Sequence, residues 1–201
     1  VVGLAPSLAS FAALFGIIWD AVNDPIVGAL SDRVRTRWGR RRPFLLLFAL
    51  PFGAAFVLLW WAPPWQNQVA LMVHIMIAYM LADTLQTLVI VPFLSLTPEL
   101  TEDYDERTSL TTYRMLFNLF ASLAAAAGAP EIVASFDSPQ RGYLFMGMIF
   151  GGLGALPFLA IFLATRERKE HTDLPTPSIR SSIKAAWENR PFRIATGINL
   201  L

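Results

Sequence analysis

Long runs of apolar residues constrain the fold of this chain more than any other feature. A segment of about 20 apolar residues crosses a hydrocarbon core of about 30 Å as a helix. Hydrophobic residues make up 55% of the 201 positions and charged residues 15%, which is too apolar for an ordinary soluble domain. The sequence therefore predicts an all-α polytopic membrane protein. The expected transmembrane helices cover about residues 3–32, 43–63, 67–96, 108–130 and 141–165.

Positively charged residues predict how these helices are oriented. A run of arginines follows the first expected span, and a second basic group follows the fifth. Lysine and arginine collect in cytoplasmic loops, so we expect both groups in the cytoplasm and residues 63–68 and 130–141 outside. A basic run between two spans also argues against a nucleic-acid partner. The first run comprises Arg33, Arg35, Arg37, Arg40, Arg41 and Arg42.

The composition becomes polar after the expected transmembrane bundle of residues 1–165. We interpret residues 166–190 as a cytoplasmic linker with a short amphipathic helix, although a plain soluble connector fits the same pattern. Residues 191–201 turn apolar again, which predicts the start of a further transmembrane helix.

The chain offers little for covalent chemistry. It has no cysteine, which excludes a disulfide, a thiol nucleophile and a thiolate metal site. Its two histidines, His74 and His171, are far apart in sequence. No nucleophile stands at a recognisable spacing from a base, so we expect no enzyme activity, no catalytic residue and no cofactor.

The first expected span contains the acidic cluster Asp20, Asn23 and Asp24, followed by Pro25. Residues three and four apart project from one face of a helix. An ionisable side chain at membrane depth costs about 3 kcal/mol even on insertion scales and marks an ion or proton path by default. The competing interpretation is a helix end, with Asp24 capping a new helix that begins at Pro25. The apolar run that continues to Leu30 favours the ion path.

Several motifs resemble those of one transporter family. Residues 28–33 (GALSDR) and 37–43 (RWGRRRP) resemble the loop signature between the second and third helices of the major facilitator superfamily. Their spacing, together with residues 19–25 (WDAVNDP), resembles the glycoside-pentoside-hexuronide:cation symporters, the melibiose-permease-like group. Further matches lie at residues 91–100, 106–108 and 113–114.

The resemblance implies that the chain covers about helices two to six of a twelve-helix transporter. It would then be a partial N-terminal six-helix half. We expect the first helix before Val1 and the carboxy-terminal half after Leu201 as the missing partners. Residues 1–201 alone are not expected to transport a solute.

In the melibiose-permease-like proteins the acids of the second helix form the cation site. The resemblance assigns this role to Asp20, Asn23 and Asp24, with a hydroxyl from Thr87. Hard oxygen ligands suit Na⁺, in which case Asp20 and Asp24 would be metal ligands, whereas a proton needs only one acid. The coupling ion is therefore Na⁺ or H⁺.

The resemblance assigns substrate binding to Arg114, with Asn118 one turn further on. A guanidinium offers donors in a fixed fork, which can bridge sugar hydroxyls or bind a carboxylate. The alternative is that Arg114 extends to the inner headgroups or pairs with an acid for structure.

The chain departs from the family pattern on the expected third span. The family's sugar-binding acid is replaced by Ile90, and an aromatic residue after the Pro-Phe pair is replaced by Leu94. Galactoside recognition of that kind is therefore not expected. Asp83 and Gln86 could contact a different substrate, while Asp83 fits equally well as a structural partner of Arg114 or of a group in the absent half.

The resemblance makes the first basic connection a gating element. Charged pairs at cytoplasmic helix ends can hold one access state and separate in the other. We expect an acidic loop with Asp105 to face the arginines, although the same charges also serve as plain topogenic residues. The expected gating residues are Asp32, Arg33, Arg40, Arg41, Arg42 and Asp105.

These features predict a secondary transporter in the plasma membrane. It would bring a glycoside or another small sugar across the lipid bilayer by alternating access, driven by Na⁺ or H⁺. One alternative keeps the fold but carries a non-sugar or lipid solute. Another is a non-transporting membrane receptor or assembly subunit.

Overall fold

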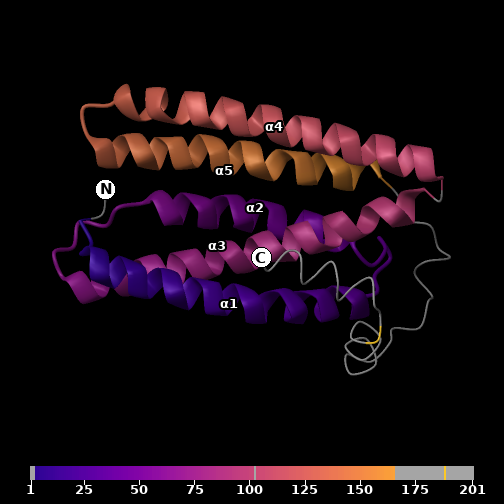
Figure 1. Ribbon diagram of the computed structural model, residues 1–201, viewed down its shortest axis with the longest axis horizontal. Helices are drawn as coiled ribbons and strands as arrows, with labels where there is room; N and C mark the ends of the chain where they lie inside the picture. The colour runs from indigo at the N-terminus through magenta and orange to yellow at the C-terminus, as the bar shows by residue number, and fades with distance from the viewer. Residues whose placement is uncertain (1–2, 102, 166–187, 189–201) are drawn as a thin grey trace.

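Five long helices make up the computed structural model, which describes residues 3–101, 103–165 and 188 (Figure 1). Each is long enough and apolar enough to cross a membrane, which confirms the prediction of an all-α polytopic membrane protein. The linker and further helix expected at residues 166–190 and 191–201 lie outside the described residues, apart from Glu188. The helices are α1 (Pro6–Arg33), α2 (Arg42–Trp60), α3 (Gln68–Leu100), α4 (Tyr104–Ala134) and α5 (Pro139–Ala164).

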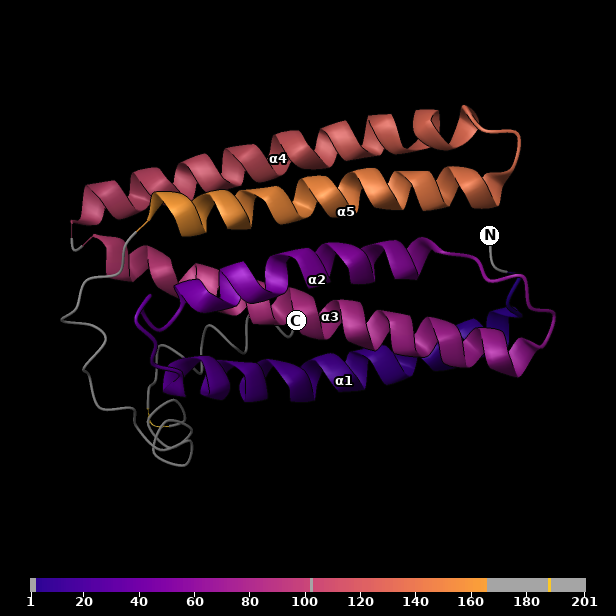
Figure 2. The ribbon, with the colours of Figure 1, turned by 180° about the vertical axis from the view of Figure 1, so that it is seen from behind.

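The helices run side by side along the long axis of the molecule (Figures 1 and 2). Helix α2 packs against both α5 and α3, α1 packs against α3, and α4 packs mainly against α5. The end of α1, the start of α2, the α3–α4 connection and the end of α5 all lie at one end of the bundle. The arginine-rich connection and the end of α5 therefore share one side, as the predicted orientation requires.

Two glycines allow the backbones of α2 and α5 to touch. A Cβ atom on Gly151 would lie 2.6 Å from the carbonyl oxygen of Gly53, and a Cβ atom on Gly53 would lie 2.6 Å from the carbonyl oxygen of Gly151. Since helices in lipid gain little from burying apolar surface against each other, close packing at small residues is what holds them together. The α2–α5 pair therefore depends on the absence of a side chain at both positions.

The α3–α4 connection is shorter than the sequence predicts. We expected a break over about residues 97–107, but α3 continues to Leu100 and α4 begins at Tyr104. Polar side chains close the gap: the Asp103 carboxylate accepts from the Glu106 amide at 2.9 Å, and Arg107 donates to the Thr101 carbonyl at 2.7 Å. A hydropathy pattern places these charged residues in a loop, whereas capping bonds let them start a helix.

Replacing Gly151 with alanine should destabilise the bundle. The added methyl group meets backbone, which cannot move aside cheaply, and overpacking of this kind costs roughly 1–3 kcal/mol. We expect the Gly151→Ala variant to melt roughly 3–10 °C lower in detergent, measured by tryptophan fluorescence.

Gly152→Ala is the matched control, because a Cβ atom there meets nothing within 4 Å. Its melting temperature should stay close to that of the unmodified protein. Equal losses in both variants would show that the glycine contact is not what holds α2 to α5.

Candidate functional site

Helix α1 carries the acidic cluster in mid-span. It runs unbroken from Pro6 to Arg33 with Pro25 inside it, so the helix end that would have made Asp24 a cap is not observed. Proline has no N–H, and this leaves the carbonyl of Ala21 without its helical donor. Carboxylate, amide and carbonyl oxygens are therefore concentrated within about one turn of a membrane-spanning helix.

Polar side chains of α1 meet polar side chains of α3 across this turn. The Thr87 hydroxyl donates to Oδ1 of Asp24 at 3.0 Å. The Asn23 amide donates to Oδ2 of Asp83 at 3.3 Å, and Asn23 itself is only 5% exposed. The structure thus places the Thr87 hydroxyl on Asp24, as a shared cation site would require. We call Asp20, Asn23, Asp24, Asp83 and Thr87 the α1–α3 polar cluster.

The cluster could hold a cation with few charged ligands. Asp20 and Asp24 are exposed on α1, and both act electrostatically on Asp83. Within the described chain, however, no three acidic or histidine side chains are grouped closely enough to hold a metal ion. A bound cation would therefore use one or two carboxylates, together with neutral oxygens such as Oδ1 of Asn23 and the hydroxyl of Thr87, which suits Na⁺ better than a divalent ion.

A second contact, which the sequence did not predict, joins α1 to α3 at the residues next to Asp20 and Asp83. The Trp19 indole donates to the Thr84 hydroxyl at 2.9 Å, and that hydroxyl donates to the Met80 carbonyl at 2.7 Å. The tryptophan was visible in the motif, but no sequence pattern indicates which residue of another helix it meets. This bond fixes the rotation of α1 against α3, and so it aligns the cluster.

Arg114 and Asn118 face a separate groove between α3, α4 and α5. The groove has a volume of about 600 Å³, and Ile90 and Leu94 line it from α3. Arg114 is half-buried and makes no ion pair with any residue that the structure describes. Among the described residues, no acid compensates its positive charge, and most of the groove lining is apolar.

The structure separates the four expected substrate residues. Asp83 faces Asn23 and the acids of α1 rather than Arg114, so a structural pair of Asp83 with Arg114 is not observed. Gln86 is exposed on α3 and does not line the Arg114 groove. Only Arg114 and Asn118 stand together as predicted.

The basic connection after α1 is a compact structure. Asp32 lies 3.0 Å from Arg41 and 3.6 Å from Arg40, while Asp105 is exposed on the first turn of α4. Arg41 therefore pairs with Asp32 in this structure and not with Asp105 as expected. Asp32 is closer to these arginines in sequence than Asp105 is. A tight turn, with Gly39 at a φ of 108°, folds the arginines back onto the end of α1.

Arg42 joins this connection to the end of α5. Its guanidinium donates to the Phe162 carbonyl and lies 4.7 Å from the centre of the Phe162 ring. The Trp38 ring meets the same phenyl ring edge-on at 6.0 Å. A positive charge on one of the last carbonyls of a helix is favoured by the helix dipole. Arg33, by contrast, is exposed.

The sequence matches the family described as MFS/sugar transport protein over residues 1–201. The chain belongs to this family of the major facilitator superfamily. It is a multi-pass integral membrane protein, and its resemblance to the glycoside-pentoside-hexuronide:cation symporters is confirmed.

Curated relatives of this family member are symporters. An uncharacterized symporter of Synechocystis sp. is 33% identical over 100% of this chain and 37% of its own length. A putative glycoside/cation symporter of Escherichia coli is 30% identical over 100% of this chain and 44% of its own length. A sodium-dependent lysophosphatidylcholine symporter of Danio rerio is 36% identical over 70% of this chain and 26% of its own length. The chain thus spans less than half the length of these relatives.

Removing the Arg42 guanidinium should release the basic connection from α5. A charge-assisted hydrogen bond and a cation–π contact together contribute about 2 kcal/mol or more. We expect Arg42→Gln to speed tryptic cleavage after the remaining arginines of the connection by roughly tenfold, measured on the purified protein by mass spectrometry.

Arg37→Gln is the control, because Arg37 stacks on the adjacent Trp38 ring within the connection. Arg37→Gln removes a tryptic site, whereas the bond after Arg42 precedes Pro43 and resists trypsin. The rates are therefore compared only at the arginine sites that both variants keep. Equal cleavage rates at the shared sites would contradict an anchoring role for Arg42.

Proposed function

We propose that this protein performs cation-coupled secondary transport of a glycoside or another small sugar by alternating access. The observation that carries the proposal is the α1–α3 polar cluster, in which carboxylates lie in mid-span and have hydroxyl and amide partners. Acids are retained at membrane depth when they bind an exchanging charge. Family membership and the glycoside/cation symporter among the relatives support the same function.

The cluster also suggests how the cation is coupled to movement. It joins α1 to α3 through Thr87 and Asn23, so a bound cation would tighten that pair and its release would loosen it. At the cytoplasmic end, Asp32 with Arg40 and Arg41 forms a charged latch next to the end of α5. A ligand that binds one arrangement better shifts the population toward it, and this links the cluster to the latch.

A second candidate is transport of an amphipathic solute. The Arg114 groove supports it, because Ile90 and Leu94 replace the polar and aromatic residues that a sugar site would use. The guanidinium of Arg114 could bind a carboxylate or phosphate while the apolar wall receives a hydrocarbon part. The relative named as a lysophosphatidylcholine symporter is consistent with this option.

Neutralising the acids should abolish coupling. We expect Asp20→Asn and Asp24→Asn each to lower cation-driven uptake by the native gene product roughly tenfold or more, because a lost charged ligand costs at least about 1.4 kcal/mol. The measurement is uptake into proteoliposomes over a sugar and lysolipid panel, with imposed Na⁺ or H⁺ gradients.

Asp137→Asn is the control, since Asp137 is exposed in the α4–α5 connection. A full cation response in both cluster variants would remove the assigned role. Binding of solute without counterflow in the unmodified protein would instead indicate a receptor.

Removing one hydroxyl tests the cluster more finely. Thr87→Val keeps the side-chain volume but deletes the bond to Asp24, and a bond to a charged group contributes about 1.5–3 kcal/mol. We expect roughly a tenfold rise in the cation concentration for half-maximal uptake. Thr112→Val is the control, because the Thr112 hydroxyl bonds only to the Thr108 carbonyl within α4. It should leave that concentration nearly unchanged, whereas equal effects would contradict the assignment of Thr87.

A further inference from the structure

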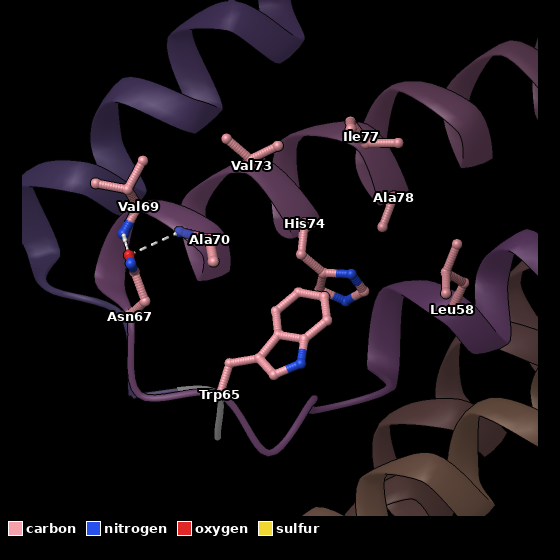
Figure 3. Close-up of a pocket in the computed structure, with 9 residues that line it drawn as sticks. All are labelled: Leu58, Trp65, Asn67, Val69, Ala70, Val73, His74, Ile77 and Ala78. Atoms are coloured by element: carbon pink, nitrogen blue, oxygen red, sulfur yellow. Dashed lines mark hydrogen bonds between the residues drawn. The ribbon is translucent and has the colours of Figure 1, made fainter.

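A groove of about 500 Å³ lies beside the α2–α3 connection (Figure 3), at the opposite end of the bundle from the basic connection (Figure 1). Leu58 near the end of α2 forms one wall, and the first turns of α3, including Val73 and Ile77, form the other. Trp65 and His74 stand at its mouth, next to the α2–α3 connection. Neither the α1–α3 polar cluster nor the Arg114 groove includes these residues.

The groove is about as long as the hydrocarbon part of one lipid leaflet is thick, and its polar groups lie at one end. Its α3 wall extends from Val69 to Ala78, which is about 14 Å at a rise of 1.5 Å per residue and close to half of a hydrocarbon core of about 30 Å. Val69 and Ile77 are 60% and 54% exposed. The polar lining groups lie at the connection end, where tryptophan marks the membrane–water boundary.

The connection end of the groove is lined by aromatic rings and carries no charged side chain. The rings of Trp61 and Trp65 meet the His74 ring nearly at right angles, with centroids 5.4 and 5.8 Å away. Nε2 of His74 lies 3.3 Å from the Trp61 carbonyl oxygen. Since a carbonyl only accepts, Nε2 donates there, and Nδ1 of the neutral ring remains an acceptor.

This chemistry favours an ammonium group over a lone phosphate. Residues 61–82 contain no lysine, arginine, aspartate or glutamate, so no cation is present in the connection or along this wall to bind a phosphate. Indole faces attract cations, and quaternary ammonium groups in particular. The imidazole acceptor can take a hydrogen bond from a primary ammonium.

We propose that this groove binds a zwitterionic phospholipid of the outer leaflet. Its acyl chain lies along Val73 and Ile77, and its ammonium headgroup rests on Trp65 and His74. The proposal concerns a second ligand and does not depend on the transported solute. A lipid bound at the outer end of α3 would stabilise the α2–α3 connection.

Photo-crosslinking of the native gene product tests this site. Benzoylphenylalanine replaces Ile77 in one variant and Leu153 in another, because Leu153 is a similarly exposed residue on α5. Both are reconstituted in vesicles of equal parts phosphatidylethanolamine and phosphatidylglycerol, and the adducts are identified by mass spectrometry. We expect the ethanolamine-to-glycerol ratio at Ile77 to be at least threefold that at Leu153.

Adding Trp65→Leu and His74→Leu to the Ile77 probe should lower its ratio to that of Leu153. Equal ratios at the two positions in the otherwise unmodified protein would overturn the proposal, because they indicate unselective boundary lipid. An excess of phosphatidylglycerol at Ile77 would also overturn it. So would crosslinks to peptide in place of lipid, since protein would then cover the groove.

Discussion

The hydrogen bonds between α1 and α3 are the interaction on which the rest of this structure depends. A carboxylate in lipid is tolerated when polar partners or a cation replace its water. Thr87 and Asn23 supply part of that replacement to Asp24 and Asp83, whereas Asp20 lies exposed beside them. The cluster is therefore held firmly by the helix pair and remains accessible for exchange, which are the two properties that a coupling site needs.

The two ends of the bundle differ in chemistry. The end that holds the basic connection is charged: Asp32 pairs with two arginines, and Arg42 binds the end of α5. The opposite end carries the aromatic group of Trp61, Trp65 and His74. Arg41 is buried while Asp32 is partly exposed, so separating this pair costs more than separating an ion pair on the surface. Aromatic side chains at the membrane–water boundary hold a helix end in place.

The length of the apolar runs and the distribution of the arginines predict much of this fold. Apolar runs predict five spans, and the arginines predict their orientation, because each signal depends only on local composition. The motif around Asp24 predicts a partner at Thr87 only through resemblance. Helical periodicity shows which face a residue occupies but not which neighbour it meets, and this is why Trp19 with Thr84 and Arg42 with α5 were not foreseen.

Asp83 illustrates the same limit within the site. Its position near the middle of a span indicates function, but the sequence left substrate contact and a pair with Arg114 equally open. The rotation of α3 decides the matter: the helix turns Asp83 toward Asn23 and presents Ile90 and Leu94 to the Arg114 groove. One helix thus contributes to the α1–α3 polar cluster and to the Arg114 groove through different faces.

Infrared difference spectroscopy tests the central claim most directly, because the bands of carboxyl and carboxylate groups respond to a bound cation and are visible without a transport assay. On the purified native gene product, changing the Na⁺ concentration or the pH should alter such bands, and the change should be absent in a variant combining Asp20→Asn and Asp24→Asn. The same change in that variant, or no response to either cation in the unmodified protein, would contradict an exchanging cation at the α1–α3 polar cluster.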